Sequence, residues 1–139
     1  MTIAVSTASV RFADSIADEI EAVYDEITSR AYKLFLARRG EGTLDIEDWL
    51  LAERELLIKP PAHIWRTPDQ LEVTIDLNDV SPTSIEIVIA LQTLLIHSLN
   101  STAYPKIFRT VNLPSPIDPE RIQIRYRDGF MVLAADISK

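Results

Sequence analysis

Two histidines and a small group of carboxylates are the residues of this chain that could do acid–base or metal chemistry. His63 and His97 are the only histidines, they lie far apart, and the chain has no cysteine. A metal site would therefore need carboxylate ligands that only the fold could bring together. Four carboxylates sit together on one predicted helix: Glu47, Asp48, Glu53 and Glu55. Their spacing fits one solvated helix face, with a general acid–base pair as the alternative, and His97 within an apolar run fits a hydrogen-bonded residue of the core or its rim.

Motifs for nucleophilic catalysis and phosphate binding are missing from the sequence. No serine stands in a Gly-x-Ser-x-Gly turn, which would expose it as a nucleophile. The chain has only 3 glycines, and none belongs to a phosphate-cradling loop. We therefore expect no enzyme activity, no cofactor, no bound metal and no use of ATP.

Composition and charge indicate a folded domain that binds other proteins. The chain has 139 residues, 47% of them hydrophobic and 25% charged, which suits one domain with an appendage. The net charge of −7 argues against binding to nucleic acid, which requires a basic surface. No apolar run reaches the ~20 residues that cross a membrane, and no basic region precedes the apolar residues near the N-terminus. With no cysteine, these features are typical of a cytoplasmic protein.

The residues from Ile107 to Ala135 predict three antiparallel strands. A short run, Ile107–Leu113, is stopped by two nearby prolines, which lack a backbone N–H for a sheet. Residues 121–127 then alternate strictly between polar and apolar, and Asp128-Gly129 separates them from the apolar run 130–135. This combination is a strong hairpin signal, in which Gly129 takes a positive φ.

These residues resemble the second half of the α-crystallin domain of small heat-shock proteins. The positions that carry the resemblance are Arg109, Leu113, Pro114, Ile117, Asp118, Ile122, Asp128, Gly129, Val132 and Leu133. The residues from Ala62 to Leu99 read like the first half of the same domain. They predict strands at 62–66 and 71–77, and at 85–91 and 94–99, where the last two are apolar on both faces. The resemblance covers about residues 60–136 and implies a mainly β fold, an antiparallel immunoglobulin-like β-sandwich.

The first part of the chain predicts a helical hairpin in front of this sandwich. Residues 1–10 read as a loose tail, and apolar residues at steps of three and four then predict a helix from Phe12 to about Leu34. Gly40 fits the end of this helix, and Asp45 fits the cap of a second helix that ends before Pro60-Pro61. Residues 30–56 also resemble a short bacterial helical domain of unknown function, which implies no chemistry. We therefore expect a helical hairpin over residues 1–59 and the sandwich over 60–139, with Trp49 and Trp65 as packing anchors.

Two features depart from the small heat-shock protein pattern. Only Asn100–Lys106 separates two predicted strands where many members carry a long loop that exchanges a strand with a partner. The Ile-x-Ile segment that ends many members and docks on a neighbour is also missing. We therefore expect a dimer or a small oligomer, with the helical hairpin as the replacement contact.

The candidate site residues are apolar or structural and not catalytic. The resemblance implies an inter-strand or inter-subunit ion pair for Arg109; alternatively, its guanidinium reaches solvent past the strand edge. Four isoleucines on two predicted edge strands could bind an extended segment of a client or partner, and alternatively they are ordinary core. These residues are Ile87, Ile89, Ile122 and Ile124. Gly129, like Arg109, has a structural role.

The resemblance implies a function as a molecular chaperone of the stress response. Such a protein would be an ATP-independent holdase that binds partly unfolded client proteins through apolar sandwich edges and the N-terminal helices. The alternative is a dedicated protein–protein interaction module, an adaptor, that uses the same sandwich without general chaperone activity. Because the long loop and the Ile-x-Ile segment are missing here, the adaptor is favoured more for this chain than for an ordinary member of the family.

Overall fold

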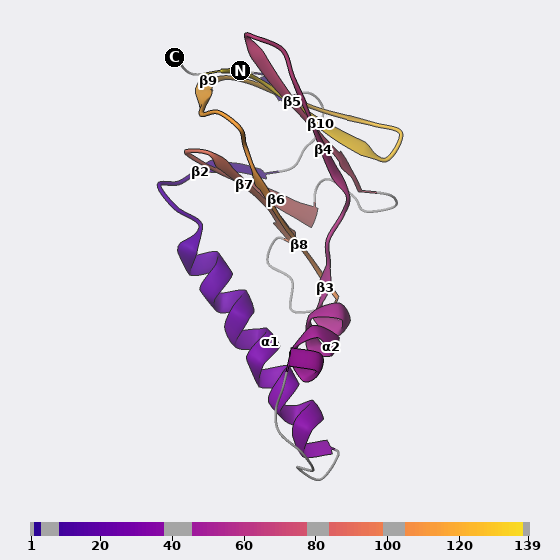
Figure 1. The fold of residues 1–139 in the computed structure, drawn as a ribbon. Coiled ribbons are helices and arrows are strands. Elements are labelled where there is room, and N and C mark those ends of the chain that lie inside the picture. Colours follow the sequence, from indigo (N-terminus) through magenta and orange to yellow (C-terminus); the bar gives the residue numbers. More distant parts are fainter. Residues whose placement is uncertain (1, 4–8, 38–45, 78–83, 99–104, 138–139) are drawn as a thin grey trace.

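Two facing β-sheets form the centre of the computed structural model, which describes residues 2–3, 9–37, 46–77, 84–98 and 105–137. The two sheets are stacked, and the helices lie below the second sheet (Figure 1). The first sheet has the order β1 (Thr2–Ile3), β9 (Ile117–Arg127), β10 (Phe130–Ile137), β5 (Gln70–Asp76) and β4 (Ala62–Arg66). The second has the order β2 (Ser9–Phe12), β6 (Ile85–Ala90), β7 (Thr93–Ser98), β8 (Lys106–Asn112) and β3 (Leu57–Ile58). The predicted β-sandwich with N-terminal helices is confirmed.

Alternating apolar side chains place the core between the two sheets. On β5, Leu71, Val73 and Ile75 point inward and are at most 1% exposed, while Glu72 between them is exposed. Side chains of β6, β7, β9 and β10 complete the same cluster. Burial of each large aliphatic side chain contributes about 1.5–3 kcal/mol, so this cluster is the main source of stability.

The Asp-Gly hairpin near the C-terminal end forms as predicted. β9 and β10 pair antiparallel, with Arg127 opposite Phe130. The two turn residues, Asp128 and Gly129, have φ angles of 52° and 83°, the left-handed region that a two-residue hairpin turn needs at both positions. The third predicted strand, β8, does not join them: it pairs with β7 in the other sheet. The proline-containing segment after β8 carries the chain from one sheet to the other.

The strands β6 and β7 are apolar on both faces because one face meets the other sheet, and the segment that leads into α1, with Ala13 and Ile16, packs on the opposite face. Leu94 belongs to the core between the sheets, and its neighbour Leu95 belongs to a second cluster on the helix side. Both side chains are 0% exposed. The second cluster also contains Val88 of β6 and Ile16, which lies just before the first helix.

The two helices, α1 (Ala17–Ala37) and α2 (Ile46–Leu56), form the predicted hairpin. Their contact is close because Ala31 of α1 and Ala52 of α2 are small and at most 1% exposed. An ion pair of 2.7 Å between Arg30 Nε and Glu55 Oε2 also joins them. α1 is continuous and begins at Ala17 rather than Phe12, with the Ala17 N–H donating to Ser15 Oγ at 3.0 Å. Gly40 and Asp45 lie outside the described residues.

Two short strands come before the first helix. The prediction of a loose tail over residues 1–10 is therefore wrong for residues 2–3 and 9–10, which the structure describes. Thr2–Ile3 joins the first sheet and Ser9–Phe12 the second, each by parallel pairing. Leu57–Ile58, after α2, adds to β8. Trp65 on β4 is 62% exposed, so it is not the packing anchor that we expected. None of the helices in the described residues has the length and apolarity of a membrane-spanning segment.

Candidate functional site

The four candidate isoleucines lie on two strands that border the core at the same side of the sandwich. Ile87 and Ile89 of β6 are 0% and 4% exposed. Ile122 and Ile124 of β9 are 4% and 6% exposed. All four belong to the core cluster between the sheets. This burial fits their reading as core residues, and their contact with a partner stays a prediction.

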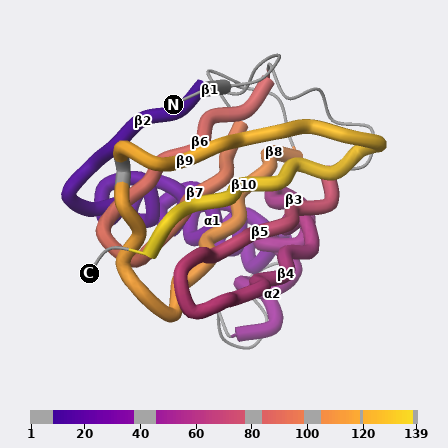
Figure 2. Tube along the Cα trace, turned by 90° about the horizontal axis from the view of Figure 1, so that it is seen from above, coloured from indigo at the N-terminus to yellow at the C-terminus, as the bar shows by residue number. Residues whose placement is uncertain are grey.

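Both of these strands are covered at their outer edge by residues from the N-terminal part of the same chain. β1 pairs with β9, with Ile3 opposite Ile124, and β2 pairs with β6, with Val10 opposite Ile87. The indigo N-terminal segment runs along this side of the molecule, next to β6 (Figure 2). An extended segment from elsewhere could therefore reach the β6 edge only where β2 is displaced.

Side chains of β2 alternate between the core and the helix side. Val10 packs against the core cluster, and Phe12, on the same face, pairs with Ile89 and is 52% exposed. Arg11 points to the opposite face. Its Nη2 lies 2.9 Å from Glu19 Oε2 on α1 and 3.4 Å from Glu86 Oε1 on β6. Arg11 thus connects β2 to both α1 and β6.

The charged groups around Arg11 stabilise one another in their ionised forms. His97 on β7 shares Glu86 with Arg11, through a hydrogen bond of 2.9 Å between His97 Nε2 and Glu86 Oε1. Hydrogen bonds to Glu19 and then to Glu86 raise the pKa of Arg11, and the bond from Arg11 lowers the pKa of Glu19. Burial acts to raise the pKa of Glu86, but the hydrogen bonds from His97 and Arg11 outweigh it, so the pKa is lowered. Both carboxylates are therefore held in their charged form.

His97 lies at the rim of the sheet, in agreement with the reading of it as a hydrogen-bonded residue. Its ring also meets the edge of Phe108, with centroids 6.4 Å apart. His63 is exposed on β4, in the other sheet. The described residues contain no group of three or more His, Asp or Glu side chains placed to hold a metal ion.

Arg109 lies on the inner face of β8, opposite Ile96. Its Nε is buried and has no hydrogen-bond partner among the described residues. On the side away from β7, β3 pairs with β8 only at Lys106 and Ile107. Among the described residues, β8 therefore has no partner strand on this edge from Phe108 onward. Arg109 lies in this unpaired stretch of β8. The ion pair between strands or subunits that the resemblance implies stays a prediction.

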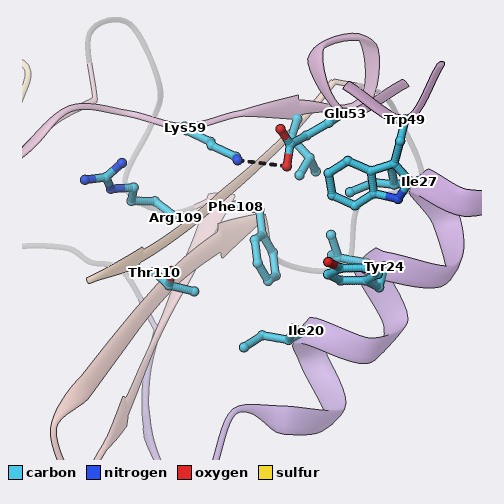
Figure 3. Close-up of a pocket in the computed structure, with 11 residues that line it drawn as sticks. Ile20, Tyr24, Ile27, Trp49, Glu53, Lys59, Phe108, Arg109 and Thr110 are labelled. Carbon is cyan, nitrogen blue, oxygen red and sulfur yellow. Dashed lines mark ion pairs between the residues drawn. The ribbon is translucent and has the colours of Figure 1, made fainter. Parts of the chain in front are cut away.

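A cleft of about 230 Å³ lies between the helical hairpin and this part of β8. Tyr24 of α1, Trp49 of α2 and Phe108 of β8 form its aromatic wall, and the centroids of the Tyr24 and Trp49 rings are 5.1 Å apart. Lys59 Nζ and Glu53 Oε2 close one end with an ion pair of 2.9 Å. The guanidinium of Arg109 points away from the aromatic wall (Figure 3). The cleft is lined mainly by apolar side chains, with a few charges at its rim.

Comparison with known proteins supports the fold. No family model matches the chain, and no curated protein matches it. Heat shock protein 16.0 from Schizosaccharomyces pombe is similar in structure, with a TM-score of 0.52 and 13% identity, over 68% of this chain and 84% of that one. HSP18.5 from E. histolytica gives a TM-score of 0.51 and 11% identity, over 59% of this chain and 90% of that one.

A third similar structure is the Del-C4 mutant of hsp14.1 from Sulfolobus solfatataricus P2. Its TM-score is 0.50 with 16% identity, over 78% of this chain and 96% of that one. At such identities the likeness concerns the arrangement of the strands, and the resemblance read from the sequence is confirmed at that level. The chain has the α-crystallin-type β-sandwich fold of small heat-shock proteins.

Proposed function

We propose that this protein is an ATP-independent holdase that binds partly unfolded proteins in the cytoplasm. The observation that carries this proposal is the set of apolar side chains that the helical hairpin leaves exposed, next to a strand edge that has no partner strand among the described residues. The large apolar side chains of the hairpin that are at least 37% exposed are Ile20, Tyr24, Tyr32, Leu36, Ile46, Leu50 and Leu51. Large apolar side chains that stay exposed on one element are a feature of surfaces that bind other polypeptides. The shared fold with heat-shock proteins supports the same function.

The free edge of β8 gives this surface a way to hold an extended segment. From Phe108 to Asn112 its outward N–H and C=O groups have no strand partner among the described residues. A client segment added there would form main-chain hydrogen bonds that do not depend on its sequence. Its side chains on the helix side would lie over the aromatic cleft of Tyr24, Trp49 and Phe108.

Self-association is the second part of the proposal. A free strand edge can also pair with the same edge of a second copy, across a twofold axis. We expect a dimer or a small oligomer, in which Arg109 would lie close to the contact. Competition between self-association and client binding would then control how much of the edge is available.

A dedicated adaptor is the second candidate, and one observation favours it. The edges of β6 and β9 carry strands from the same chain, which limits their access to arbitrary clients. A partner selected for one edge could still bind. An adaptor would bind one protein tightly in a pulldown and fail to protect unrelated proteins from aggregation.

Suppression of aggregation distinguishes the two candidates. A heat-labile client is warmed without nucleotide, with the full chain at a near-stoichiometric ratio, and light scattering is followed. We expect suppression, and we expect Leu50→Gln to weaken it because this 44% exposed side chain belongs to the apolar hairpin surface. Phe130→Gln is the matched control, since Phe130 is 43% exposed on the β9–β10 hairpin. Full aggregation with the wild-type chain, or equal losses in both variants, would contradict the holdase proposal.

A further inference from the structure

We infer that the cleft between the helical hairpin and β8 is a binding site for a small quaternary ammonium ion, held among the aromatic rings of Tyr24, Trp49 and Phe108. The inference goes beyond the proposed function, because such an ion would bind whether or not the chain holds unfolded proteins. Two features carry it: the arrangement of the three rings, and a carboxylate at the end of the cleft.

Three separate elements bring the aromatic rings to the cleft. Tyr24 comes from α1, Trp49 from α2 and Phe108 from β8. The centroids of the Tyr24 and Trp49 rings are 5.1 Å apart and the ring planes are tilted by 45°, so the two rings form a corner rather than a stack. Phe108 stands on the other side of the cleft, across from Tyr24 (Figure 3). The three rings therefore border one space from two sides.

Two of the three rings are held in place by the packing behind them. Trp49 and Phe108 both pack against the buried cluster that contains Ile27 and Leu57. Tyr24, by contrast, is 55% exposed. A ligand in the cleft would therefore meet two rings that are already positioned, and it would lose little affinity through the ordering of side chains.

A carboxylate stands at one end of the cleft. Glu53 follows Trp49 by one turn of α2, so the two side chains lie on the same face of this helix. The Glu53 side chain is 21% exposed, and its Oε2 is paired with Nζ of Lys59, whose side chain is 45% exposed. Lys59 can return its ammonium group to water when another cation takes its place beside Glu53. The guanidinium of Arg109 points away from the rings, so it does not oppose a cation there (Figure 3).

The chemistry of the cleft selects a quaternary ammonium ion. The faces of aromatic rings attract cations, and several rings around one space are the usual surroundings of a quaternary ammonium group in proteins. A primary ammonium is strongly hydrated and would lose more by leaving water. The volume of about 230 Å³ is below the ~300–1,000 Å³ of pockets for drug-sized ligands, so a compact ion fits. The net charge of −7 also attracts cations to the chain.

The fluorescence of Trp49 reports binding in the full-length chain that carries Trp65→Phe. The chain has 2 tryptophans, and Trp65 is 62% exposed on β4 in the other sheet, so this substitution leaves a single indole, in the cleft. Choline chloride replaces sodium chloride at constant ionic strength, and the emission is followed. We expect a saturable change with a dissociation constant in the millimolar range. The neutral isostere of choline, in which carbon replaces the ammonium nitrogen, should bind about tenfold more weakly.

Substitutions in the same background test the roles of the rings and of the carboxylate. Tyr24→Leu keeps an apolar side chain but removes one aromatic face, and it should weaken choline binding about tenfold. Tyr32→Leu, the same change at a 51% exposed position further along α1, is the matched control and should leave the affinity unchanged. Lys59→Met should tighten binding about threefold, because Glu53 then has no ammonium group of the chain beside it. Should Tyr24→Leu lose its cooperative thermal unfolding, Phe108→Leu replaces it under the same criteria.

A change in emission that does not saturate, equal affinities for choline and its neutral isostere, or equal affinities of the Tyr24 and Tyr32 variants would overturn the inference. A peptide that carries trimethyllysine tests the source of the ammonium group, and tighter binding of this peptide than of choline would overturn the assignment to a small free ion. These outcomes are separate from the fate of the holdase proposal. Choline binding without suppression of aggregation would remove only the holdase, and suppression without choline binding would remove only the present inference.

Discussion

Leu95→Ala tests whether the segment that leads into α1 covers the outer face of β7. Leu95 lies on the outer face of β7, where Ile16, just before α1, packs in the same cluster, and its side chain is 0% exposed. The substitution removes three carbon atoms, and at about 0.8 kcal/mol per buried carbon the transfer loss alone is about 2.4 kcal/mol. The cavity left behind increases the loss, so the free energy of unfolding should fall by about 2.5–5 kcal/mol.

Two other leucines provide the controls for this measurement. Leu94→Ala, on the inner face of the same strand, should cost a similar amount, because Leu94 is also 0% exposed. Leu91→Ala, at a 73% exposed position, should change stability by no more than about 0.5 kcal/mol. With a urea m-value of about 2 kcal/mol/M, the first two variants should lower the unfolding midpoint by about 1.2 M or more. A loss for Leu95→Ala as small as that for Leu91→Ala would refute the burial of this face beneath the segment that leads into α1.

Three further predictions concern single positions in the two sheets. Gly129→Val should lower the free energy of unfolding by about 1–2 kcal/mol because φ is 83° there, and Gly129→Asn should cost less; equal stability of all three chains would contradict this. Arg109→Ala should lower the melting temperature or the mass measured by light scattering, whereas Arg125→Ala should change neither, and an unchanged mass and melting point would remove the special status of Arg109. The carboxylates that hold Arg11 have lowered pKa values, so their contribution is complete above their ordinary value of 4.5 and is lost as the pH falls through the lowered values. The difference in urea midpoint between the wild-type chain and Arg11→Ala should therefore stay constant from pH 7 to about pH 5 and shrink below it; a difference that grows in acid would show the opposite sign.

The strands of the sandwich could be predicted because their signals are local. The alternation along β5 and the Asp-Gly pair before β10 depend on neighbours in the sequence. The two-sided apolar character of β6 and β7 also predicted correctly that both of their faces are covered. The segment that covers the second face, with Ala13 and Ile16, could not be identified from the sequence.

The strand β2 could not be predicted because its signal is not local. Four residues, Ser9–Phe12, are too few for a convincing alternation, and the strand is stabilised by pairing with β6 and by the ion pairs of Arg11. The helical spacing that begins at Phe12 competed with it, so the helix was predicted to start too early. The exposure of Trp65 could not be predicted for a similar reason. Nothing near Trp65 in the sequence distinguishes an edge strand that has one uncovered face from a strand that is covered on both faces.

The candidate site was predicted in part. The sequence placed Ile87, Ile89, Ile122 and Ile124 on strands, as the structure has them, and their contact with a partner stays a prediction. It could not show that segments of the same chain lie along those edges. It singled out Arg109 but overlooked Arg11. A basic residue between Val10 and Phe12 is an ordinary pattern, and only the folded chain brings it within 3.4 Å of Glu86.

The parallel pairing of β2 with β6 has a consequence for the order of events during synthesis. Arg11 and Glu86 are 75 residues apart, and the ladder between their strands cannot close before the later strand has left the ribosome. During synthesis β2 therefore leaves the ribosome first and has no partner strand until β6 has been made. In this interval the growing chain is open to exchange of β2 with another newly made copy, so the rate of translation and the local density of ribosomes would influence how many molecules finish closed on themselves.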